Sequence, residues 1–285
     1  MRRPPSPGPS ATSRPHADTS TVTPQHPFFV RAATPRVFAH RGLVTAEAAA
    51  DGVTENTFAA IALAHGAGAT YVESDCHLTA DGAVVLFHDA DLSRVAGDPR
   101  AIADVRLLEL EELMAHRGGL LTLAQALESF PTLRFNLDVK AAAAAAPVGA
   151  GVAPYSDRVL LTSFSDARRR QALDAATRGD ARPATSAGRG VIARLLLAVA
   201  LHSPRLAHRV LRGIDAVQIP ERQGLLRVLT PRLVDYAHRA SVEVHVWTVN
   251  DPDDMRRLVA LGVDGLVTDR ADLALSLVDG DKPRR

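Results

Sequence analysis

The sequence predicts an α/β fold, a (β/α)8 TIM barrel with a small inserted segment after the second strand. Three observations predict it. Eight β-type runs alternate with helical runs along the chain, and polar residues stand at the C-terminal ends of those runs. The length of 285 residues is also one that such barrels commonly use for a single domain.

Short runs rich in Val, Ile, Leu and Phe indicate the strands, and longer runs rich in Ala and Leu indicate the helices. The expected strands are 37–40, 71–75, 133–140, 158–163, 183–187, 214–220, 242–249 and 264–268. The expected helices include 57–66, 123–129, 167–176, 191–201, 230–240 and 252–261. Strands that alternate with helices pair in parallel, and eight such units predict a closed barrel.

Polar side chains end one expected strand after another, at the edge where such barrels carry their active sites. Asp138 and Lys140 share a face of their strand, because side chains alternate with a period of two, and so close a pair indicates function or mutual pairing. For Ser163, Gln218 and Asn250, loop capping or core hydrogen bonding is an equally good explanation.

A hairpin is expected to follow the second strand. Asp81-Gly82, flanked by apolar residues, is typical of a two-residue turn, which would pair residue 78 with 85 and residue 75 with 88. Asp75 would then face His88, and Glu73 would share their face. A slip of one residue would send His88 to the other face.

Two histidines, two carboxylates and one arginine therefore lie within fifty residues. His40 and His88 can exchange protons near neutral pH. Glu73 and Asp75 can bind a hard divalent cation through oxygen, and Arg41 can bind phosphate oxygens. This set predicts metal-assisted phosphate chemistry, although a lone Glu-x-Asp is more often a solvated strand edge.

The composition excludes some classes of function. Apolar residues make up 46% of the chain, as in an ordinary globular protein with a full core. The net charge of +1 gives no electrostatic reason to expect a nucleic-acid partner. A single cysteine, Cys76, rules out a disulfide within the chain and suits a reducing compartment.

The ends of the chain are expected to lie outside the barrel domain. Residues 1–30, rich in Pro, Ser and Thr, are expected to be a disordered tail, with the barrel at 31–278 and a frayed end at 279–285. The tail lacks the apolar run of a secretory signal, which predicts a cytoplasmic location. Residues 191–201 fall short of the ~20 needed to span a membrane, so a buried or amphipathic helix without stable membrane insertion is expected.

Other features are given structural roles. Residues 141–146 favour a helix, but Pro147 and Gly149 follow, so a short or broken helix in a loose segment is expected. His245 precedes Trp247 by two residues and is expected to have a packing role. The other histidines are expected on the surface, in the tail or on helices: His16, His26, His65, His77, His116, His202, His208 and His238.

The chain resembles the glycerophosphodiester phosphodiesterase family over residues 36–277. The motifs that carry the resemblance are Ala39-His-Arg-Gly42, Glu55-Asn56, Tyr71-Val-Glu-Ser-Asp75, Asp81-Gly82, His88-Asp89, Asn136-Leu-Asp-Val-Lys140, Thr162-Ser-Phe164, Trp247-Thr-Val-Asn250 and Gly265-Leu-Val-Thr-Asp269. Each is weak alone, but their order and spacing are specific. The resemblance implies a (β/α)8 barrel with an inserted segment, which residues 90–119 would supply.

The resemblance also implies roles for individual residues. Glu73, Asp75 and Asp138 would ligate a divalent cation, with Mg²⁺ or Ca²⁺ favoured and Mn²⁺ as a further candidate. His40 and His88 would act as acid and base. The chain departs from the family at Asp138, where the family usually has Glu. The shorter side chain leaves the reaction class intact but can shift metal preference or admit a water ligand.

Four further positions follow from the same resemblance. Arg41 and Lys140 would neutralise the phosphodiester, Glu55 would hold the polar network of the site, and Trp247 would line the substrate pocket. Thr54 stands where the family usually has Pro, so the mouth of the pocket is less well defined than its floor.

The implied activity is metal-dependent hydrolysis of a small glycerophosphodiester to glycerol 3-phosphate and an alcohol, within lipid and glycerol metabolism. One rival is a lysophospholipase D acting on longer acyl substrates, with an apolar groove formed by residues 191–201 and 225–229. The other is a non-catalytic barrel that binds a ligand. The sequence argues against the latter because both histidines, all three carboxylates, the arginine and the lysine are present.

Overall fold

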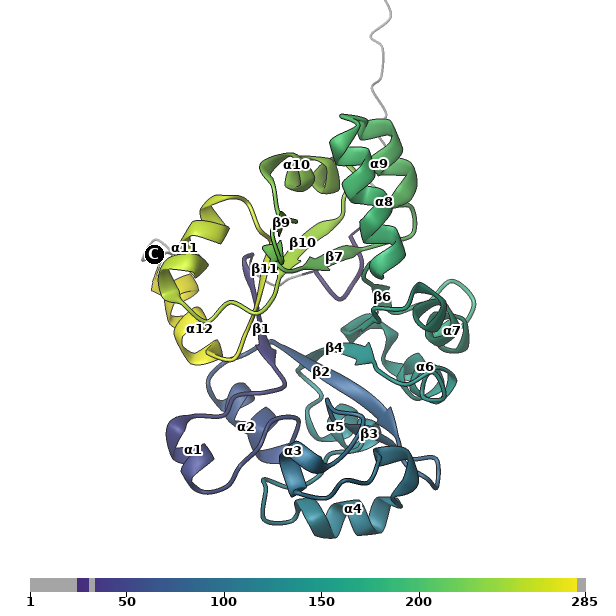
Figure 1. The fold of residues 1–285 in the computed structure, drawn as a ribbon, viewed down its shortest axis with the longest axis vertical. Helices are drawn as coiled ribbons and strands as arrows, with labels where there is room; N and C mark the ends of the chain where they lie inside the picture. Colours follow the sequence, from purple (N-terminus) through teal and green to yellow (C-terminus); the bar gives the residue numbers. More distant parts are fainter. Residues whose placement is uncertain (1–24, 31–33, 281–285) are drawn as a thin grey trace, which may run out of the picture.

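Parallel strands form a nearly closed barrel at the centre of the fold, with helices around it (Figure 1). The computed structural model describes residues 25–30 and 34–280. The barrel strands are β1 (Arg36–His40), β2 (Tyr71–Leu78), β4 (Arg134–Val139), β5 (Val159–Thr162), β6 (Ala184–Thr185), β7 (Ala216–Ile219), β10 (Glu243–Val246) and β11 (Gly265–Thr268). Their order is β6-β5-β4-β2-β1-β11-β10-β7, and a parallel bridge from Ser186 to Ala216 joins the two ends. The expected (β/α)8 barrel is confirmed.

The expected helices form within one or two residues of the expected ranges. They are α2 (Phe58–Gly66), α5 (Leu123–Ser129), α7 (Asp166–Ala176), α8 (Arg189–Ala200), α10 (Pro231–Arg239) and α11 (Pro252–Ala260). Polar N-caps fix the starts of all of these except α8, whose N-cap is Gly188; for example, Thr122 and Gln125 form a reciprocal capping box on α5. The shorter α1 (Ala46–Ala50), α9 (Pro204–Val210) and the last helix α12 (Ala271–Gly280) complete the outer ring.

The inserted segment after the hairpin has a small core of its own. It contains α3 (Ser93–Ala96), the 3-10 turn η1 (Ile102–Asp104) and α4 (Leu107–Met114). Its buried side chains are Val85, Phe87, Leu92, Val95, Ile102, Val105, Leu110 and Met114. The insertion therefore packs against β3 (Val84–Leu86) rather than extending the barrel core.

The expected hairpin register is wrong by one residue. Residue 78 pairs with 84, and 76 pairs with 86, so Asp75 lies opposite Phe87 and not opposite His88. The loop has three residues, because Thr79 N–H donates to Ala83 O (2.9 Å) and Gly82 adopts a φ of +85°. A three-residue loop with a left-handed glycine is the other common solution for Asp-Gly hairpins.

The segment that was expected to be loose is packed against the barrel, and its helix is short, as expected. The helix is α6 (Ala145–Val152), followed by the 3-10 turn η2 (Ala153–Arg158). Pro147 lies in the first turn, where its missing N–H would have had no helical partner. A Cβ at Gly149 would overlap the carbonyl of Ala172, so glycine is what lets α6 approach α7 closely.

Residues 25–30, expected in the tail, belong to the folded barrel. Phe28 and Phe29 are buried at its N-terminal end, and Tyr71 donates a hydrogen bond from its hydroxyl to Phe28 O (2.9 Å). The rest of the expected tail, residues 1–24, and residues 281–285 lie outside the described ranges. The expected frayed end begins inside α12, which runs to Gly280.

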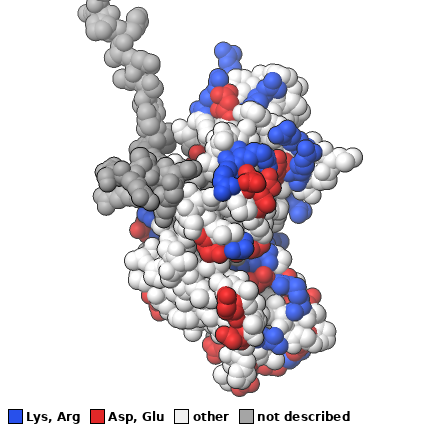
Figure 2. Space-filling model, turned by 90° about the vertical axis from the view of Figure 1, so that its left-hand side faces the viewer, with Lys and Arg blue, Asp and Glu red and all other residues white. Residues whose placement is uncertain are grey.

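On the face drawn in Figure 2, acidic and basic side chains are intermixed. Exposed ion pairs include Arg239 with Asp235 and Arg256 with Asp253. Among the described residues, none of the helices combines the length and the apolar character that a membrane crossing requires.

A buried polar network closes the barrel at the end opposite the strand C-termini. Arg36 donates two hydrogen bonds of 2.8 Å to Glu243, whose Oε2 lies 3.0 Å from His245 Nε2. His245 is fully buried, and its ring packs on Phe38 at 4.7 Å between centroids. Burial alone would raise the pKa of Glu243, but the hydrogen bonds from Arg36 and His245 lower it to about 2.

We expect Glu243→Gln to destabilise the fold by about 3 kcal/mol at pH 7, because it removes the carboxylate from the buried ion pair with Arg36. The folded pKa lies below the ordinary value of 4.5, so this stabilisation is present above about pH 4.5 and is lost as the pH falls towards 2. Urea unfolding of the wild type and the variant at pH 7 and pH 3 measures it. The exposed Glu112→Gln is the control, and a difference that stays constant with pH would contradict the prediction.

Candidate active site

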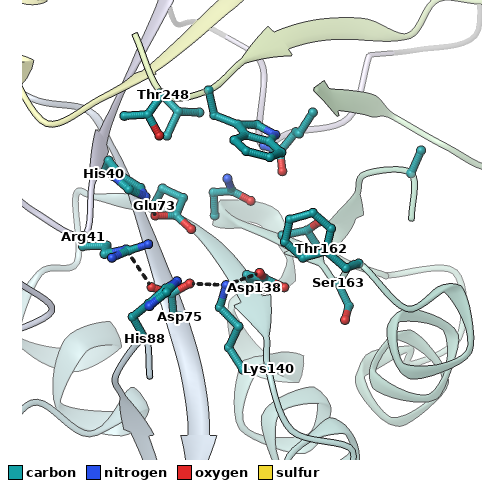
Figure 3. A pocket seen from close by; sticks show the side chains of 16 residues that line it. His40, Arg41, Glu73, Asp75, His88, Asp138, Lys140, Thr162, Ser163 and Thr248 are labelled. Carbon is teal, nitrogen blue, oxygen red and sulfur yellow. Dashed lines mark ion pairs between the residues drawn. The ribbon is translucent and has the colours of Figure 1, made fainter. Parts of the chain in front are cut away.

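A pocket of about 200 Å³ opens at the C-terminal ends of the barrel strands (Figure 3). Every expected site residue except Glu55 lines it: His40, Arg41, Glu73, Asp75, His88, Asp138, Lys140 and Trp247. The remaining lining residues are Asn136, Thr162, Ser163, Phe164, Ala187, Gln218, Thr248 and Val267. The volume suits a small molecule, since one water in the liquid occupies about 30 Å³.

The His40-Arg41-Gly42 turn is held by backbone geometry. Arg41 adopts the left-handed conformation with a φ of +59°, and its N–H donates to Glu73 O (2.8 Å). Gly42 has a φ of +93°, and a Cβ there would come within 2.7 Å of the backbone of Ala60 on α2. The turn therefore needs glycine, and its packing on α2 points the side chains of His40 and Arg41 into the pocket.

Strand register brings the acidic residues together from distant parts of the sequence. His40 on β1 is level with Glu73 on β2, and Asp75 on β2 is level with Asp138 on β4. In a parallel sheet such neighbours lie about 5 Å apart on one face. This arrangement replaces the expected pairing of Asp75 with His88 as the reason why the site assembles.

Two cations lie among these carboxylates. Lys140 Nζ is 2.9 Å from Asp75 Oδ1 and 2.7 Å from Asp138 Oδ2, and Arg41 Nε is 3.1 Å from Asp75 Oδ2 (Figure 3). Arg41 also pairs with Glu55 at 2.8 Å. Glu55 thus contacts the site through Arg41 and does not line the pocket itself.

The carboxylates remain crowded despite these cations. Burial and the neighbouring charge of Asp75 raise the pKa of Glu73 to about 8. Burial also raises the pKa of Asp138, although Lys140 opposes the shift. Burial alone would lower the pKa of Lys140, but Asp75 and Asp138 outweigh it and raise that pKa, so Lys140 stays charged.

Three buried oxygen atoms of the pocket accept no hydrogen bond from the described residues. They are Glu73 Oε2, Asn136 Oδ1 and Asp138 Oδ1. In the described part of the chain, no group of three Asp, Glu, His or Cys side chains is already arranged to bind a metal. Lys140 lies between two of the expected ligands, Asp75 and Asp138. Unpaired hard oxygens together with a raised carboxylate pKa nevertheless fit one further cation.

His40 is oriented by Asp269, a residue for which the sequence predicts no role. Asp269, after β11, accepts a 2.6 Å hydrogen bond from His40 Nδ1, and Asn250 donates to the other oxygen of Asp269 at 2.7 Å. The other ring nitrogen of His40, Nε2, lies 3.8 Å from Glu73 Oε2. Asp269 was visible as a polar residue at a strand end, but 229 residues separate it from His40.

His88 is held in a similar way. Its Nδ1 donates to Asp89 Oδ1 at 2.6 Å, and Arg94 of α3 donates to the other oxygen of Asp89 at 2.6 Å. The expectation that His77 lies on the surface, in the tail or on a helix is wrong. It is buried in β2, and its Nε2 donates to the carbonyl of His88 at 3.2 Å.

The opposite wall of the pocket is largely apolar. Phe164 meets Trp247 edge to face at 5.9 Å between ring centroids. Ser163 donates to Val139 O (2.9 Å) and Gln218 donates to His245 (3.3 Å), so both line the pocket and also make core hydrogen bonds.

Comparisons with known proteins find related sequences and a related fold. The model of the glycerophosphoryl diester phosphodiesterase family matches residues 40–273. Probable glycerophosphodiester phosphodiesterase 2 of Mycobacterium tuberculosis is 37% identical over 238 residues, covering 82% of this chain and 87% of that protein. A glycerophosphodiester phosphodiesterase of Caldanaerobacter subterraneus is 28% identical over 261 residues, covering 85% and 97%. The crystal structure of such an enzyme from Thermotoga maritima has a TM-score of 0.64 at 25% identity, covering 86% and 99%.

Proposed function

The chain belongs to the glycerophosphoryl diester phosphodiesterase family, and on this premise we propose that it hydrolyses a glycerophosphodiester to glycerol 3-phosphate and an alcohol. It is a phosphoric diester hydrolase by family. The observation that carries the proposal is one pocket that holds two carboxylate-oriented histidines, two cations and three buried carboxylates. Proton transfer and charge stabilisation are what cleavage of a phosphodiester requires.

Substrate binding is assigned to Arg41 and Lys140. Both cations line the pocket, and Arg41 presents a planar fork that matches two phosphate oxygens. As the P–O bond breaks, negative charge grows on the non-bridging oxygens, and these fixed cations stabilise it without reorganisation. Glu55 keeps Arg41 in place through their 2.8 Å ion pair.

Proton transfer is assigned to His40 and His88. One imidazole accepts the proton of the attacking hydroxyl, and the other donates a proton to the oxygen of the leaving alcohol. Asp269 and Asp89 each bind the Nδ1 of their histidine, which leaves both Nε2 atoms for this exchange. The attacking group is the glycerol 2-hydroxyl, which gives a cyclic phosphate that water then opens, or water itself.

Glu73, Asp75 and Asp138 are proposed to hold a divalent cation, Mg²⁺ or Ca²⁺. When bound, such a cation polarises a phosphate oxygen and adds positive charge to the pocket. The unpaired Glu73 Oε2 and Asp138 Oδ1 are the oxygens available to it, with Asn136 Oδ1 beside them. The short side chain at Asp138 still has one free oxygen while the other binds Lys140.

The apolar wall of Trp247 and Phe164 is assigned to the alcohol part of the substrate. The rival activity, lysophospholipase D, needs room for an acyl chain, and a pocket of about 200 Å³ favours the small head group instead.

Turnover of glycerophosphocholine is compared with turnover of lysophosphatidylcholine, assayed in turn with Mg²⁺, Ca²⁺ and Mn²⁺, to test the proposal. Faster cleavage of the acyl substrate would reverse the assignment, and no hydrolysis under any condition would leave a binding module.

We expect His40→Ala and His88→Ala each to lower kcat/KM by at least about 10²-fold, because each removes one proton-transfer group. The exposed His116→Ala is the matched control and should retain full turnover. Steady-state kinetics with a soluble glycerophosphodiester measures the effect. Near wild-type rates in both single variants would refute the assignment.

The Asp269→Asn variant identifies which role His40 plays. Burial alone would lower the pKa of His40, but Asp269 and Glu73 outweigh it and raise that pKa; removing the Asp269 charge should therefore lower it. If His40 is the base, the acidic limb of the pH profile of kcat/KM moves to lower pH. If it is the acid, the alkaline limb moves to lower pH. Exposed Asp253→Asn serves as the control, and a profile unchanged by Asp269→Asn rules out this positioning role.

Removal of divalent metal by a chelator should abolish turnover while circular dichroism stays unchanged, and one of Mg²⁺, Ca²⁺ or Mn²⁺ should restore it. Glu73→Gln should weaken metal binding at least about tenfold by calorimetry, whereas exposed Glu128→Gln should not. Full activity in excess chelator would remove the metal from the proposal.

A further inference from the structure

A small hairpin projects at the end of the barrel where the pocket opens. Its strands β8 (Arg222–Gln223) and β9 (Leu226–Arg227) pair antiparallel in the connection between β7 and α10 (Figure 1). Trp247, which lines the pocket, donates its backbone N–H to Ile219, the last residue of β7 before the hairpin (3.2 Å). Residues 222–227 are all exposed.

The base of the hairpin is fixed. Val228 and Leu229 are buried, and both donate backbone hydrogen bonds to Glu221 O, at 3.0 and 3.2 Å. The side chain of Glu221 accepts two hydrogen bonds from Arg257, at 3.0 and 2.7 Å. The hairpin is therefore anchored at its base while its tip reaches into solvent.

The tip consists of two adjacent leucines. Leu225 is 101% exposed and Leu226 57% exposed, and Leu225 is the most exposed large hydrophobic side chain among the described residues. A single exposed leucine is ordinary, because apolar atoms make up much of any protein surface. Two neighbouring leucines at the end of an anchored projection contribute nothing to the core. Packing inside the folded protein therefore does not explain why these two positions are apolar.

Two cations flank this apolar tip, and a third stands at the wall of the pocket. Arg222 and Arg227 stand at its two sides, and Arg189 lies over the ring of Phe164, 4.7 Å from its centroid, at the pocket wall. Within the described ranges none of these three guanidinium groups forms an ion pair with a carboxylate. Phe164 itself is 43% exposed. This rim of the barrel therefore combines leucine, an aromatic ring and arginines that have no carboxylate partner among the described residues.

We propose that the hairpin 222–227 docks the barrel onto an anionic phospholipid surface. Leu225 and Leu226 enter the boundary between head groups and acyl chains, and Arg222 and Arg227 contact lipid phosphates. The apolar tip is too small for a stable protein interface, which covers about 800 Å² on each partner. Lipid insertion, by contrast, is effective with a few apolar side chains and nearby cations. The inference concerns binding and does not depend on the reaction proposed for the pocket.

Vesicle binding by the full chain tests the docking. Wild type should co-sediment with vesicles of phosphatidylcholine and phosphatidylglycerol, and Leu225→Ser/Leu226→Ser should reduce the partition coefficient at least about tenfold. Leu201→Ser is the matched control. Leu201 is 61% exposed and follows the C-terminal end of α8, about 18 Å along that helix from its start beside Phe164. Equal sedimentation of the wild type and the double variant would overturn the proposal.

A label on the tip reports insertion directly. The only cysteine, Cys76, is buried, so an environment-sensitive dye reacts selectively with Leu225→Cys, or with Leu201→Cys as the control. Emission from position 225 should shift to the blue on addition of the anionic vesicles, while position 201 should not respond. No shift at position 225, or equal shifts at both positions, would contradict docking through the hairpin.

The arginines are tested separately. Arg222→Gln/Arg227→Gln should weaken binding to the anionic vesicles about fivefold for each charge removed, with less effect on phosphatidylcholine vesicles. Thermal unfolding and turnover of a soluble diester by the hairpin variants check that the fold and pocket are intact, so failure of hydrolysis is distinguished from failure of docking. If the leucine variant instead converts a dimer to a monomer without lipid, the tip is a self-association surface and the proposal fails.

Discussion

The fold and the site depend on one electrostatic constraint: carboxylates buried at the rim of a barrel must be balanced by cations. The parallel register fixes the positions of these carboxylates. It sets Asp75 level with Asp138, and Glu73 lies two residues before Asp75 on the same face of β2. Lys140, two residues beyond Asp138 on the same strand face, supplies the nearest compensating charge. The motif Asn136-Leu-Asp-Val-Lys140 is therefore one electrostatic unit, in which the acid would be costly to bury without the base.

The same constraint appears at the other end of the barrel, where Arg36 and Glu243 form the buried pair. Between the two polar ends, the interior is filled by Phe38 and Tyr71, with other apolar side chains of the strands. This apolar layer keeps the charges of the site apart from those of the N-terminal end. Each end can therefore carry its own charged groups. Those at the C-terminal ends of the strands serve the chemistry, and those at the opposite end close the barrel.

The sequence was sufficient for the strands and for most of the pocket because both follow from local patterns. Alternation fixed the strand faces, and strand ends fixed the edge on which polar residues gather. The sequence was not sufficient where two local backbone conformations have similar energies. Asp81-Gly82 suits a two-residue or a three-residue loop, and the choice shifts the register by one. His88 still reaches the pocket because the chain leaves β3 after Leu86, so strand pairing no longer decides where it points. Contacts such as Asp269 with His40 span 229 residues, and no local pattern encodes them.

The charges of the pocket also explain why a metal and the substrate would bind in an interdependent way. Three carboxylates face two cations, Arg41 and Lys140, and Glu73 avoids the excess negative charge by holding a proton up to a pKa of about 8. An anionic diester entering such a pocket meets no net attraction. A divalent cation would displace the proton from Glu73 and leave the pocket with a net positive charge, which attracts the diester. The short Asp138 matters in this balance because it binds Lys140 through one oxygen and keeps the other unpaired. A metal at that free oxygen would leave the Lys140–Asp138 contact in place, whereas at Asp75 it would meet the lysine, which lies 2.9 Å from Oδ1.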